Sequence, residues 1–434
     1  MINNNLLQVM KMYDSRHLQK RHKFMQACNC IIIFIVKLEK LMNSKILFAG
    51  YFIAAALFFS CTKDSASSEK ATTDSSSGYA SVRSSSSSGG GQGGNASGVI
   101  TAGEWNDLAH WDFWKTLLLK DTIKQIPSIW GIYPKNKVVL FLKDINNNPI
   151  TDAKITMQYG GNTVISKTDN FGNAVLFAGL YEANSILTNF TLQANYNGQV
   201  FNIGSFLNDG ATIYKSIPVN KIATKTLDIL FAVDATGSMG DEISYLKREI
   251  LDVINRSGAQ LPGVQINMGS IFYRDFGDEY VVRSFPFTSV KQQLVNFINL
   301  QQAEGGGDFP EAVDEALIEA TQNMQWSSNA VNRLLFLILD APPHKEQVNV
   351  EKLKTAIKTA QEKGIRIIPI SASGINRETE ILLRSLSIST NSTYVFITND
   401  SGIGNPHLTP TVGNYTVEFL NNLMVRLITK YGKN

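Results

Sequence analysis

Apolar residues in the second half of the chain form short runs that alternate with stretches of helical periodicity. Buried strands are predicted near 227–234, 266–274, 280–286, 333–340, 366–371 and 393–397. Helices are predicted near 240–256, 288–301, 310–325, 347–363, 376–387 and 414–430. This alternation predicts an α/β domain over residues 226–432, a doubly wound, mostly parallel sheet flanked by helices. The strands at 266–286 should add one antiparallel edge.

Residues 135–220 follow a different pattern. Short alternating strands such as Val138–Leu142 and Phe190–Ala194 are separated by turn signals such as Gly160-Gly161-Asn162. This spacing predicts a small antiparallel β-sandwich. The pattern resembles the carboxypeptidase-regulatory-like and immunoglobulin-like modules of bacterial surface proteins. No catalytic constellation appears in it, so we expect a spacer or docking module.

Residues 99–134 precede the sandwich and are rich in tryptophan. Trp105, Trp111 and Trp114 lie within ten residues of one another. Aromatic residues this dense bury a large area when they pack. We expect the segment to dock onto a neighbouring domain, and a platform that stacks ligands is the alternative.

The strand predicted at 227–234 ends in an unusual group of oxygen-bearing side chains. Asp234, Thr236 and Ser238 alternate along the turn that leads into the next helix. A carboxylate and two hydroxyls are hard oxygen ligands, which suit Mg²⁺, Mn²⁺ or Ca²⁺ better than Zn²⁺. Open α/β sheets place their ligands at the carboxyl ends of strands. The sequence therefore predicts a divalent-cation site at this edge.

The motif Asp-x-Thr-x-Ser after an apolar strand resembles the metal-ion-dependent adhesion site of the von Willebrand factor type A domain. Three further segments follow in that family's order, namely Ile271–Asp275, Gly305–Ala312 and Leu335–His344. The resemblance implies hydroxyl ligands at Thr236 and Ser238 and carboxylates at Asp234 and Asp340. It also implies a protein ligand whose acidic side chain completes the coordination of the cation.

The third loop departs from the common family pattern. Asp308 stands where most members have Thr, and it becomes a fifth expected ligand. An added carboxylate neutralises more of the cation's charge and weakens its pull on a partner's carboxylate. Arg274 and Asp275 are expected to pair or to lie behind the ligands. His344 is expected to be a second-shell donor, with a plain loop histidine as the alternative.

Glu242 and Glu311 lie at predicted helix starts. We expect both carboxylates to act as favourable charges at helix amino termini, with a catalytic base as the alternative for Glu311.

The amino-terminal residues resemble an export signal. Residues 42–60 have the length and form of a lipoprotein signal peptide, and Cys61 follows as the expected lipid attachment site. Thr62-Lys63-Asp64 resembles the surface-export signal of Bacteroidetes lipoproteins. Residues 1–41 lack a signal's form, which indicates a start codon assigned too early. The region 61–98 is rich in Ser and Gly and predicts a flexible tether. A simple membrane anchor is the alternative.

Charge and cysteine content limit the possible partners and cross-links. Residues 1–60 hold eight Lys/Arg and two Asp/Glu of the chain's 40 and 37, which leaves 32 and 35 for the rest. The folded part is thus slightly acidic, which argues against a nucleic-acid partner. All three cysteines lie at or before residue 61, so no disulfide framework is available beyond it.

The function expected is a metal-dependent protein-binding module for adhesion or assembly, not an enzyme, on an outer-membrane lipoprotein exposed at the bacterial surface. A metal-dependent hydrolase is one alternative, although no paired general acid and base is evident. The other is a structural module whose cation stiffens the loops.

Overall fold

The computed structural model describes residues 98–402 and 404–433, apart from the side chain of residue 241. The strands are β1 Thr101–Trp105, β2 Asn136–Lys143, β3 Lys154–Tyr159, β4 Asn162–Lys167, β5 Asn173–Ala178, β6 Asn189–Tyr196, β7 Gln199–Leu207, β8 Thr212–Ser216, β9 Thr226–Asp234, β10 Gln265–Tyr273, β11 Val282–Thr288, β12 Asn332–Leu339, β13 Ile365–Ser371, β14 Tyr394–Ile397 and β15 Val417–Phe419. The α-helices are α2 Trp111–Leu117, α3 Ile126–Trp130, α4 Gly240–Gln260, α5 Lys291–Asn299, α6 Val313–Ile318, α7 Gln347–Lys363, α8 Arg377–Ser389 and α9 Leu420–Gly432. Three short helical segments are η1 Gly237–Met239, η2 Glu319–Asn323 and η3 Asn399–Ser401.

A mixed eight-stranded sheet forms the centre of the larger domain, in the order β11-β10-β9-β12-β13-β14-β1-β15. The pairs that join β10, β9, β12, β13 and β14 are parallel. β11 adds an antiparallel edge beside β10, as the sequence predicts. The α/β fold and its mostly parallel sheet are therefore confirmed.

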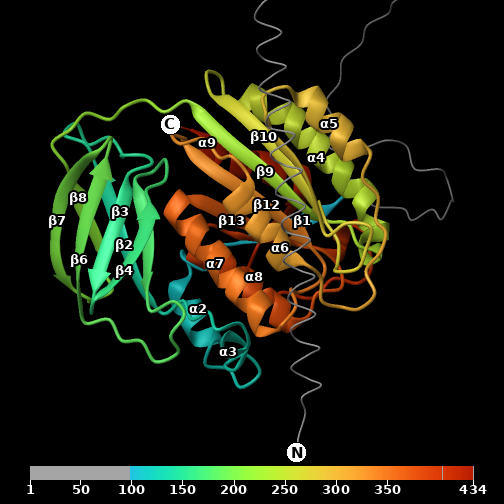
Figure 1. Cartoon of the computed structure of the whole chain (residues 1–434), viewed down its shortest axis with the longest axis horizontal. Coiled ribbons are helices and arrows are strands. Elements are labelled where there is room, and N and C mark those ends of the chain that lie inside the picture. Colours follow the sequence, from blue (N-terminus) through green and yellow to red (C-terminus); the bar gives the residue numbers. More distant parts are fainter. Residues whose placement is uncertain (1–97, 403, 434) are drawn as a thin grey trace, which may run out of the picture. The chain divides into compact units, whose positions relative to one another are not determined.

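Helices cover both faces of this sheet, and the alternation of side chains along β9 assigns them. Ile229 and Phe231 share a buried cluster with residues of α4, α5 and α9. Leu230 and Ala232 point the other way, into a cluster with residues of α6, α7 and α8. Figure 1 shows α4 and α5 on one side of the sheet and α6, α7 and α8 on the other. Burial on both faces explains why β9 reads as a continuous apolar run.

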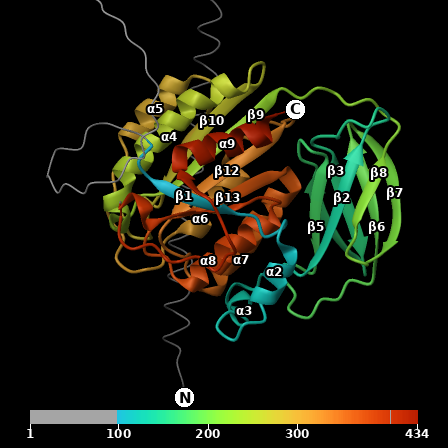
Figure 2. The same ribbon diagram turned by 180° about the vertical axis from the view of Figure 1, so that it is seen from behind.

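The tryptophan-rich segment contributes a strand that the sequence analysis did not predict. β1 lies between β14 and β15 and is antiparallel to both (Figure 2). Behind it, Trp114 and Trp130 are fully buried in the core shared with α6, α7 and α8. Asp107 binds Arg384 of α8 through two hydrogen bonds of 2.6 and 2.8 Å, with both side chains fully buried. The segment is thus built into the sheet and its core.

Residues 136–216 form two smaller sheets that share one buried core. One has the order β4-β3-β6-β7 and is antiparallel throughout. The other has the order β5-β2-β8, and its β2–β8 pair is parallel, which the expectation of purely antiparallel strands did not include. The resemblance to known surface modules stays a prediction.

These two sheets contact the central sheet where its parallel strands begin. Asp152 binds Arg333, near the start of β12, at 2.8 and 3.0 Å. Asp169 forms an ion pair of 3.1 Å with Arg366, near the start of β13. The opposite edge, where the parallel strands end, is left free of these contacts.

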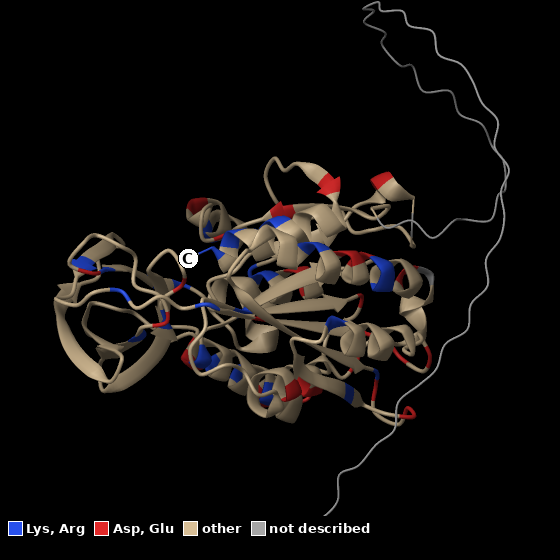
Figure 3. Ribbon diagram, turned by 90° about the horizontal axis from the view of Figure 1, so that it is seen from above, with Lys and Arg blue, Asp and Glu red and all other residues tan. Residues whose placement is uncertain are grey.

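Charged side chains are spread over the described surface. Figure 3 shows Lys and Arg interspersed with Asp and Glu over the helices, without one continuous basic face in that view of residues 98–433. No helix in the described part of the chain has both the length and the apolar character needed to cross a membrane.

Candidate metal centre

The candidate centre lies at the end of β9, where the order of the sheet reverses. The chain passes from β9 to β10 on one side and returns to β12 on the other. Such a reversal leaves a crevice at the carboxyl ends of the strands. Asp234 is the last residue of β9 and is fully buried there. The amide of Ala235 donates to the carbonyl of Tyr273 at 2.8 Å, which fixes the turn that follows.

The two hydroxyls expected as ligands gather at Asp234. Thr236 donates to Oδ1 of Asp234 through its amide at 2.9 Å and through Oγ1 at 2.7 Å. The hydroxyl of Ser238 lies 3.1 Å from Oγ1 of Thr236. Thr236 is buried, whereas Ser238 is exposed, so the cluster opens to solvent on the Ser238 side.

Asp340 approaches the same point from the end of β12. Its side chain is 4% exposed, and the hydroxyl of Ser238 lies close enough to lower its pKa. Oδ2 of Asp234 and Oδ1 of Asp340 are buried and lack a hydrogen-bond partner among the described residues. A buried carboxylate oxygen without a partner is costly. The structure thus brings four of the five expected ligands together around two unsatisfied acceptors.

The electrostatics are those of an anionic pocket without a counter-charge. Burial raises the pKa of Asp234, and the charge of Asp340 raises it further, against the hydrogen bonds from Thr236. Burial also raises the pKa of Asp340, to which the charge of Glu242 adds. Each shift means that the ionised pair is unfavourable in this environment. A divalent cation held by these two carboxylates would reverse both effects, because its positive charge would offset theirs.

The glycine loop passes close to the centre, and its conformation requires glycine. Gly305 and Gly306 have φ values of 78° and 70°, and the carbonyl of Gly305 accepts from the amide of Gly237 at 3.0 Å. A Cβ on Gly305 would lie 2.4 Å from the carboxylate of Asp278. Glycine at these positions therefore permits both the backbone turn and the close approach.

Asp308, at the end of this loop, stands apart from the buried carboxylates. Its side chain is exposed, and the structure shows no hydrogen bond or ion pair to it within the described residues. The structure does not bring this expected ligand to Asp234 and Asp340.

The residues expected behind the ligands pair differently from the prediction. Oδ1 of Asp275 lies 2.7 Å from Nε2 of His344, so the two side chains share a hydrogen bond. Arg274 does not pair with Asp275; its guanidinium faces Glu304 at 3.4 Å and Glu279 at 3.6 Å. His344 is therefore tied to Asp275, and the expectation of an Arg274–Asp275 pair is wrong.

Two buried acids near the centre have roles that the sequence analysis did not predict. Glu242 accepts from the amide of Ser373 at 3.1 Å and contacts Nε2 of His407 at 3.2 Å. Glu311 is 2% exposed and precedes α6 without bonding to its amino-terminal amides. Glu242 lies in the first turn of α4, as predicted, whereas the carboxylate of Glu311 does not cap α6. His407 lies far from the other site residues in sequence, so no local motif signals it.

The donor set fits a divalent cation by its chemistry. Two carboxylates with free oxygens and two hydroxyls are ligands that Mg²⁺, Mn²⁺ and Ca²⁺ accept. No three Asp, Glu, His or Cys side chains of the described residues converge into a ready-made cation cage. The fit therefore rests on the hydroxyls and the unpartnered oxygens together.

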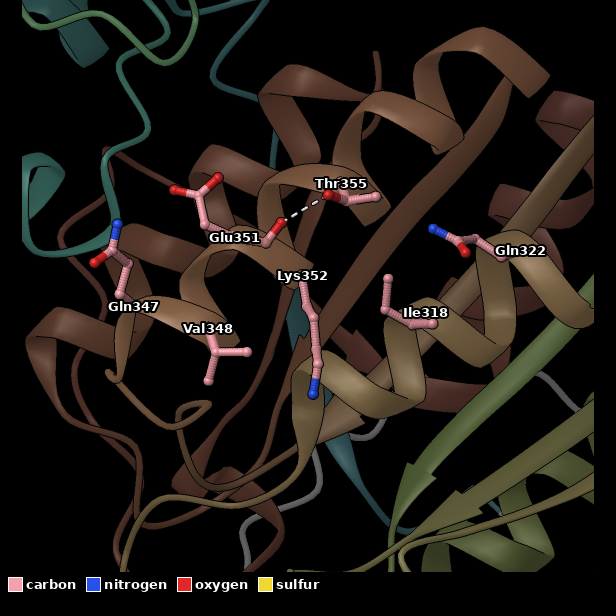
Figure 4. A pocket seen from close by; sticks show the side chains of 7 residues that line it. All are labelled: Ile318, Gln322, Gln347, Val348, Glu351, Lys352 and Thr355. Carbon is pink, nitrogen blue, oxygen red and sulfur yellow. Dashed lines mark hydrogen bonds between the residues drawn. The ribbon is translucent and has the colours of Figure 1, made fainter. Parts of the chain in front are cut away.

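A separate hollow of 760 Å³ lies between α7 and the segment formed by α6 and η2 (Figure 4). Val348 and Lys352 line it from α7, and Ile318 lines it from α6. Lys352 is paired with Glu315 and also lies 5.9 Å from the centre of the Phe276 ring. The hollow does not include the buried carboxylates, so we do not assign the cation site to it.

The sequence model of the von Willebrand factor type A domain matches residues 228–407, a range that includes every residue of the centre described above. The chain contains a von Willebrand factor type A (vWA) domain. Domains of this family are usually interaction modules, which supports a non-enzymatic reading in general terms.

Two curated proteins share part of this sequence. The putative ariadne-like RING finger protein R811 of Acanthamoeba polyphaga mimivirus is 33% identical over 121 residues, which are 27% of this chain and 11% of that protein. Alpha-protein kinase vwkA of Dictyostelium discoideum is 32% identical over 123 residues, or 28% and 19% of the two chains. The chain thus spans less than a fifth of the length of either relative.

Three solved structures match part of the chain. BatB from Bacteroides thetaiotaomicron is 18% identical with a TM-score of 0.33, covering 48% of this chain and all of that one. An aerotolerance-related membrane protein from Bacteroides fragilis is 14% identical, with a TM-score of 0.32 and coverage of 48% and 98%. Proximal thread matrix protein 1 from the mussel byssus is 14% identical, with a TM-score of 0.35 and coverage of 48% and 47%. Scores this low say nothing of function.

Proposed function

We propose that the protein is a divalent-cation-dependent protein-binding module, with its partner bound at the carboxyl edge of the vWA sheet. The observation that carries this proposal is the pair of buried, unpartnered oxygens on Asp234 and Asp340. The charge of Asp340 acts on Asp234, and the hydroxyls of Thr236 and Ser238 lie beside Asp234, which supports a shared cation site. These oxygens would hold a divalent cation, which would supply positive charge for an acidic side chain of the partner.

Different residues would hold the cation and contact the partner. Asp234, Asp340, Thr236 and Ser238 would hold Mg²⁺, Mn²⁺ or Ca²⁺, and the exposed Ser238 marks the open side. The ion supplies a Lewis-acidic position for a partner's carboxylate. Phe276 and Phe309 follow Asp275 and Asp308 in the surrounding loops and are 47% and 44% exposed. Exposed aromatic rings in these loops suit a protein partner that also brings apolar contacts.

The arrangement of the two domains favours this use. The two smaller sheets contact the ends where β12 and β13 begin, so the carboxyl edge stays available to a partner. Cys61 and the tether at 61–98 lie outside the described residues. We propose that a lipid on Cys61 anchors the chain in the outer membrane and that the tether holds the vWA domain away from the cell surface.

The two alternative functions have less support. For a hydrolase, Glu311 is the candidate base, but it is 2% exposed, which leaves its carboxylate closed to a substrate. If the cation only stiffened the loops, the exposure of the Ser238 hydroxyl and of the Phe276 and Phe309 rings would serve no purpose. The peptide-binding experiment described next distinguishes a purely structural cation from one that binds a partner.

The direct test uses a peptide array on which each peptide carries one Asp or Glu, beside the same peptide with Asn or Gln. The full-length protein is applied in Mg²⁺, in Ca²⁺ and in EDTA. We expect signals that need both the cation and the carboxylate, and that Asp234→Ala abolishes. Signals that survive EDTA, or that are equal for the amide peptides, would contradict cation-mediated capture.

A further inference from the structure

The four-stranded sheet of the smaller domain carries a row of uncharged polar side chains on its outer face. Gln158 of β3 pairs with Thr163 of β4 and with Thr191 of β6. Thr191 in turn pairs with Ser205 of β7. Paired residues of neighbouring strands point to the same face of a sheet, and Met157, the neighbour of Gln158 along β3, points into the core. The four polar side chains therefore lie side by side across the outer face.

A hollow of 530 Å³ lies at this row. The volume falls within the range of about 300–1,000 Å³ that small-molecule sites occupy. The row crosses three spacings between strands, about 14 Å, which suits an elongated ligand. Among the described residues that line the hollow, none is charged. Its amide and hydroxyl side chains are Gln158, Asn162, Thr163, Asn189, Thr191 and Ser205.

The amide and hydroxyl groups of the hollow are not engaged elsewhere. None of the six side chains forms a hydrogen bond or ion pair with another described residue. The aromatic lining, by contrast, is already in use: the Tyr159 hydroxyl accepts from the amide of Gly179 at 2.7 Å, and the rings of Phe190 and Phe206 stack at 5.7 Å. Amides and hydroxyls both donate and accept hydrogen bonds, so the hollow offers several such groups to a ligand.

The absence of charge sets this face apart from the rest of the surface. Soluble proteins carry about 25–35% charged residues on their surfaces, and Lys, Arg, Asp and Glu are spread over the helices of this chain (Figure 3). The next row of the sheet is uncharged as well, and consists of Ile165, Thr156, Gln193 and Asn202. Charge returns only in the row beyond it, at Lys154 and Lys167, and Lys167 is bound to Asp152.

This composition narrows the class of ligand. A phosphate or a nucleic acid would find no cation in the two rows. A protein partner would find none of the Trp, Tyr or Arg side chains that dominate the binding energy of protein interfaces. An uncharged ligand with many hydroxyl groups matches the row, because each of its hydroxyls also donates and accepts.

We propose that this row binds an uncharged oligosaccharide. The amides and hydroxyls bond to the sugar hydroxyls, and the ligand brings no charge that needs a partner. Leu207 pairs with Asn189 at the margin of the row and is 78% exposed, so it offers an apolar contact to the C–H face of a sugar ring. The site lies in the smaller domain and needs no cation, so it goes beyond the function proposed for the carboxyl edge of the vWA sheet.

The test applies the full-length protein, in EDTA, to immobilised hexasaccharides of glucose, mannose, xylose and N-acetylglucosamine. A hexasaccharide of galacturonic acid serves as the acidic control. We expect saturable binding to at least one neutral probe and none to the acidic probe. Equal binding of the acidic probe, or no binding to any neutral probe, would overturn the proposal.

Matched variants place the binding on the row. Gln158→Ala and Thr191→Ala should each raise the Kd of the bound hexasaccharide about 3- to 10-fold, because each removes hydrogen-bonding groups. Gln199→Ala, about 20 Å along β7 from the row, and Thr212→Ala, in the other sheet, should change it by less than about twofold. Gln158 is exposed, so its replacement should leave the melting temperature unchanged even if Thr191→Ala lowers it. Wild-type affinity in the double variant, or an equal loss in the controls, would overturn the assignment.

The variant Asp234→Ala separates this site from the cation centre. It should bind the hexasaccharide with the affinity of the wild type, in EDTA and in Mg²⁺ alike. Loss of hexasaccharide binding in this variant would move the sugar to the carboxyl edge and overturn the assignment to the sheet. A failure of cation-dependent peptide capture would instead refute the proposed function alone.

Discussion

Removal of the cation should make the stability of the protein fall as the pH rises from 5 to 8. In the folded chain, burial and then the charge of Asp340 raise the pKa of Asp234 from 3.8 to about 7. Burial, with neighbouring acids, raises the pKa of Glu311 from 4.5 to about 9. The folded state therefore keeps protons that the unfolded state has already released. The stabilisation is complete below about pH 4 and is lost as the pH rises through the folded pKa values.

The size of the effect follows from Asp234, which is fully buried. Because its pKa rises from 3.8 to about 7 on folding, this one group should lower the free energy of unfolding of the protein by roughly 3 kcal/mol between pH 5 and pH 8. Unfolding entropy near 2.1 cal/mol/K per residue, over roughly 340 described residues, converts this to a fall of about 4 °C in melting temperature. Glu311 acts in the same direction.

A cation should reverse this dependence, because it binds the ionised carboxylates and competes with protons. The assay is thermal unfolding at pH 5, 6.5 and 8, in EDTA and in Mg²⁺. Asp234→Asn should show a clearly shallower pH dependence in EDTA, with the remainder due to Glu311, whereas Asp209→Asn, an exposed control in the smaller domain, should keep the full dependence. A melting temperature in EDTA that is constant or rises with pH would refute the reasoning. An unchanged slope in Asp234→Asn would do the same.

Three further changes probe separate parts of the account. Arg333→Ala removes one cationic partner of Asp152, whose side chain is only 9% exposed, and should lower the free energy of unfolding in urea by about 3–5 kcal/mol. The cation Kd should stay the same, because this ion pair lies at the edge of the sheet opposite the cation site. A Kd changed more than twofold would show that the two edges are coupled. Ser238→Ala removes a hydroxyl ligand and should weaken cation binding about tenfold in calorimetry with little change in stability, and an unchanged Kd would exclude Ser238 as a ligand. Gly306→Ala should cost about 1–3 kcal/mol and weaken cation binding, whereas Gly307→Ala, where a Cβ meets open space, should do neither; equal effects would show that the loop conformation is unimportant.

The sequence predicted the parallel core well because burial on both faces produces long apolar runs. β9, β12 and β13 coincide with such runs and form the centre of the sheet. β1 and β15 were missed because neither forms an apolar run: their sequences are TAGEW and VEF, whereas the equally short β14 is YVFI and was predicted. Their pairing also joins distant parts of the chain, since Ala102 lies opposite Ile397. Only tertiary structure reveals such a partner.

The site shows the same division between local and distant information. Asp234, Thr236 and Ser238 lie within five residues and meet as the sequence predicts. Arg274 and Asp275 were expected to pair or to lie behind the ligands; they do not pair, and instead Arg274 reaches Glu304 while Asp275 contacts His344. The contact between Glu242 and His407 joins residues 165 positions apart, beyond the reach of any motif.

The most direct test of the central claim is calorimetric titration of the full-length protein with Mg²⁺, Ca²⁺ and Mn²⁺, with Asp234→Ala measured beside the wild type. The account predicts saturable binding of one cation per vWA domain by the wild type and no binding by the variant. Absence of binding by the wild type, or equal binding by both proteins, would contradict a cation centre at the carboxyl end of β9.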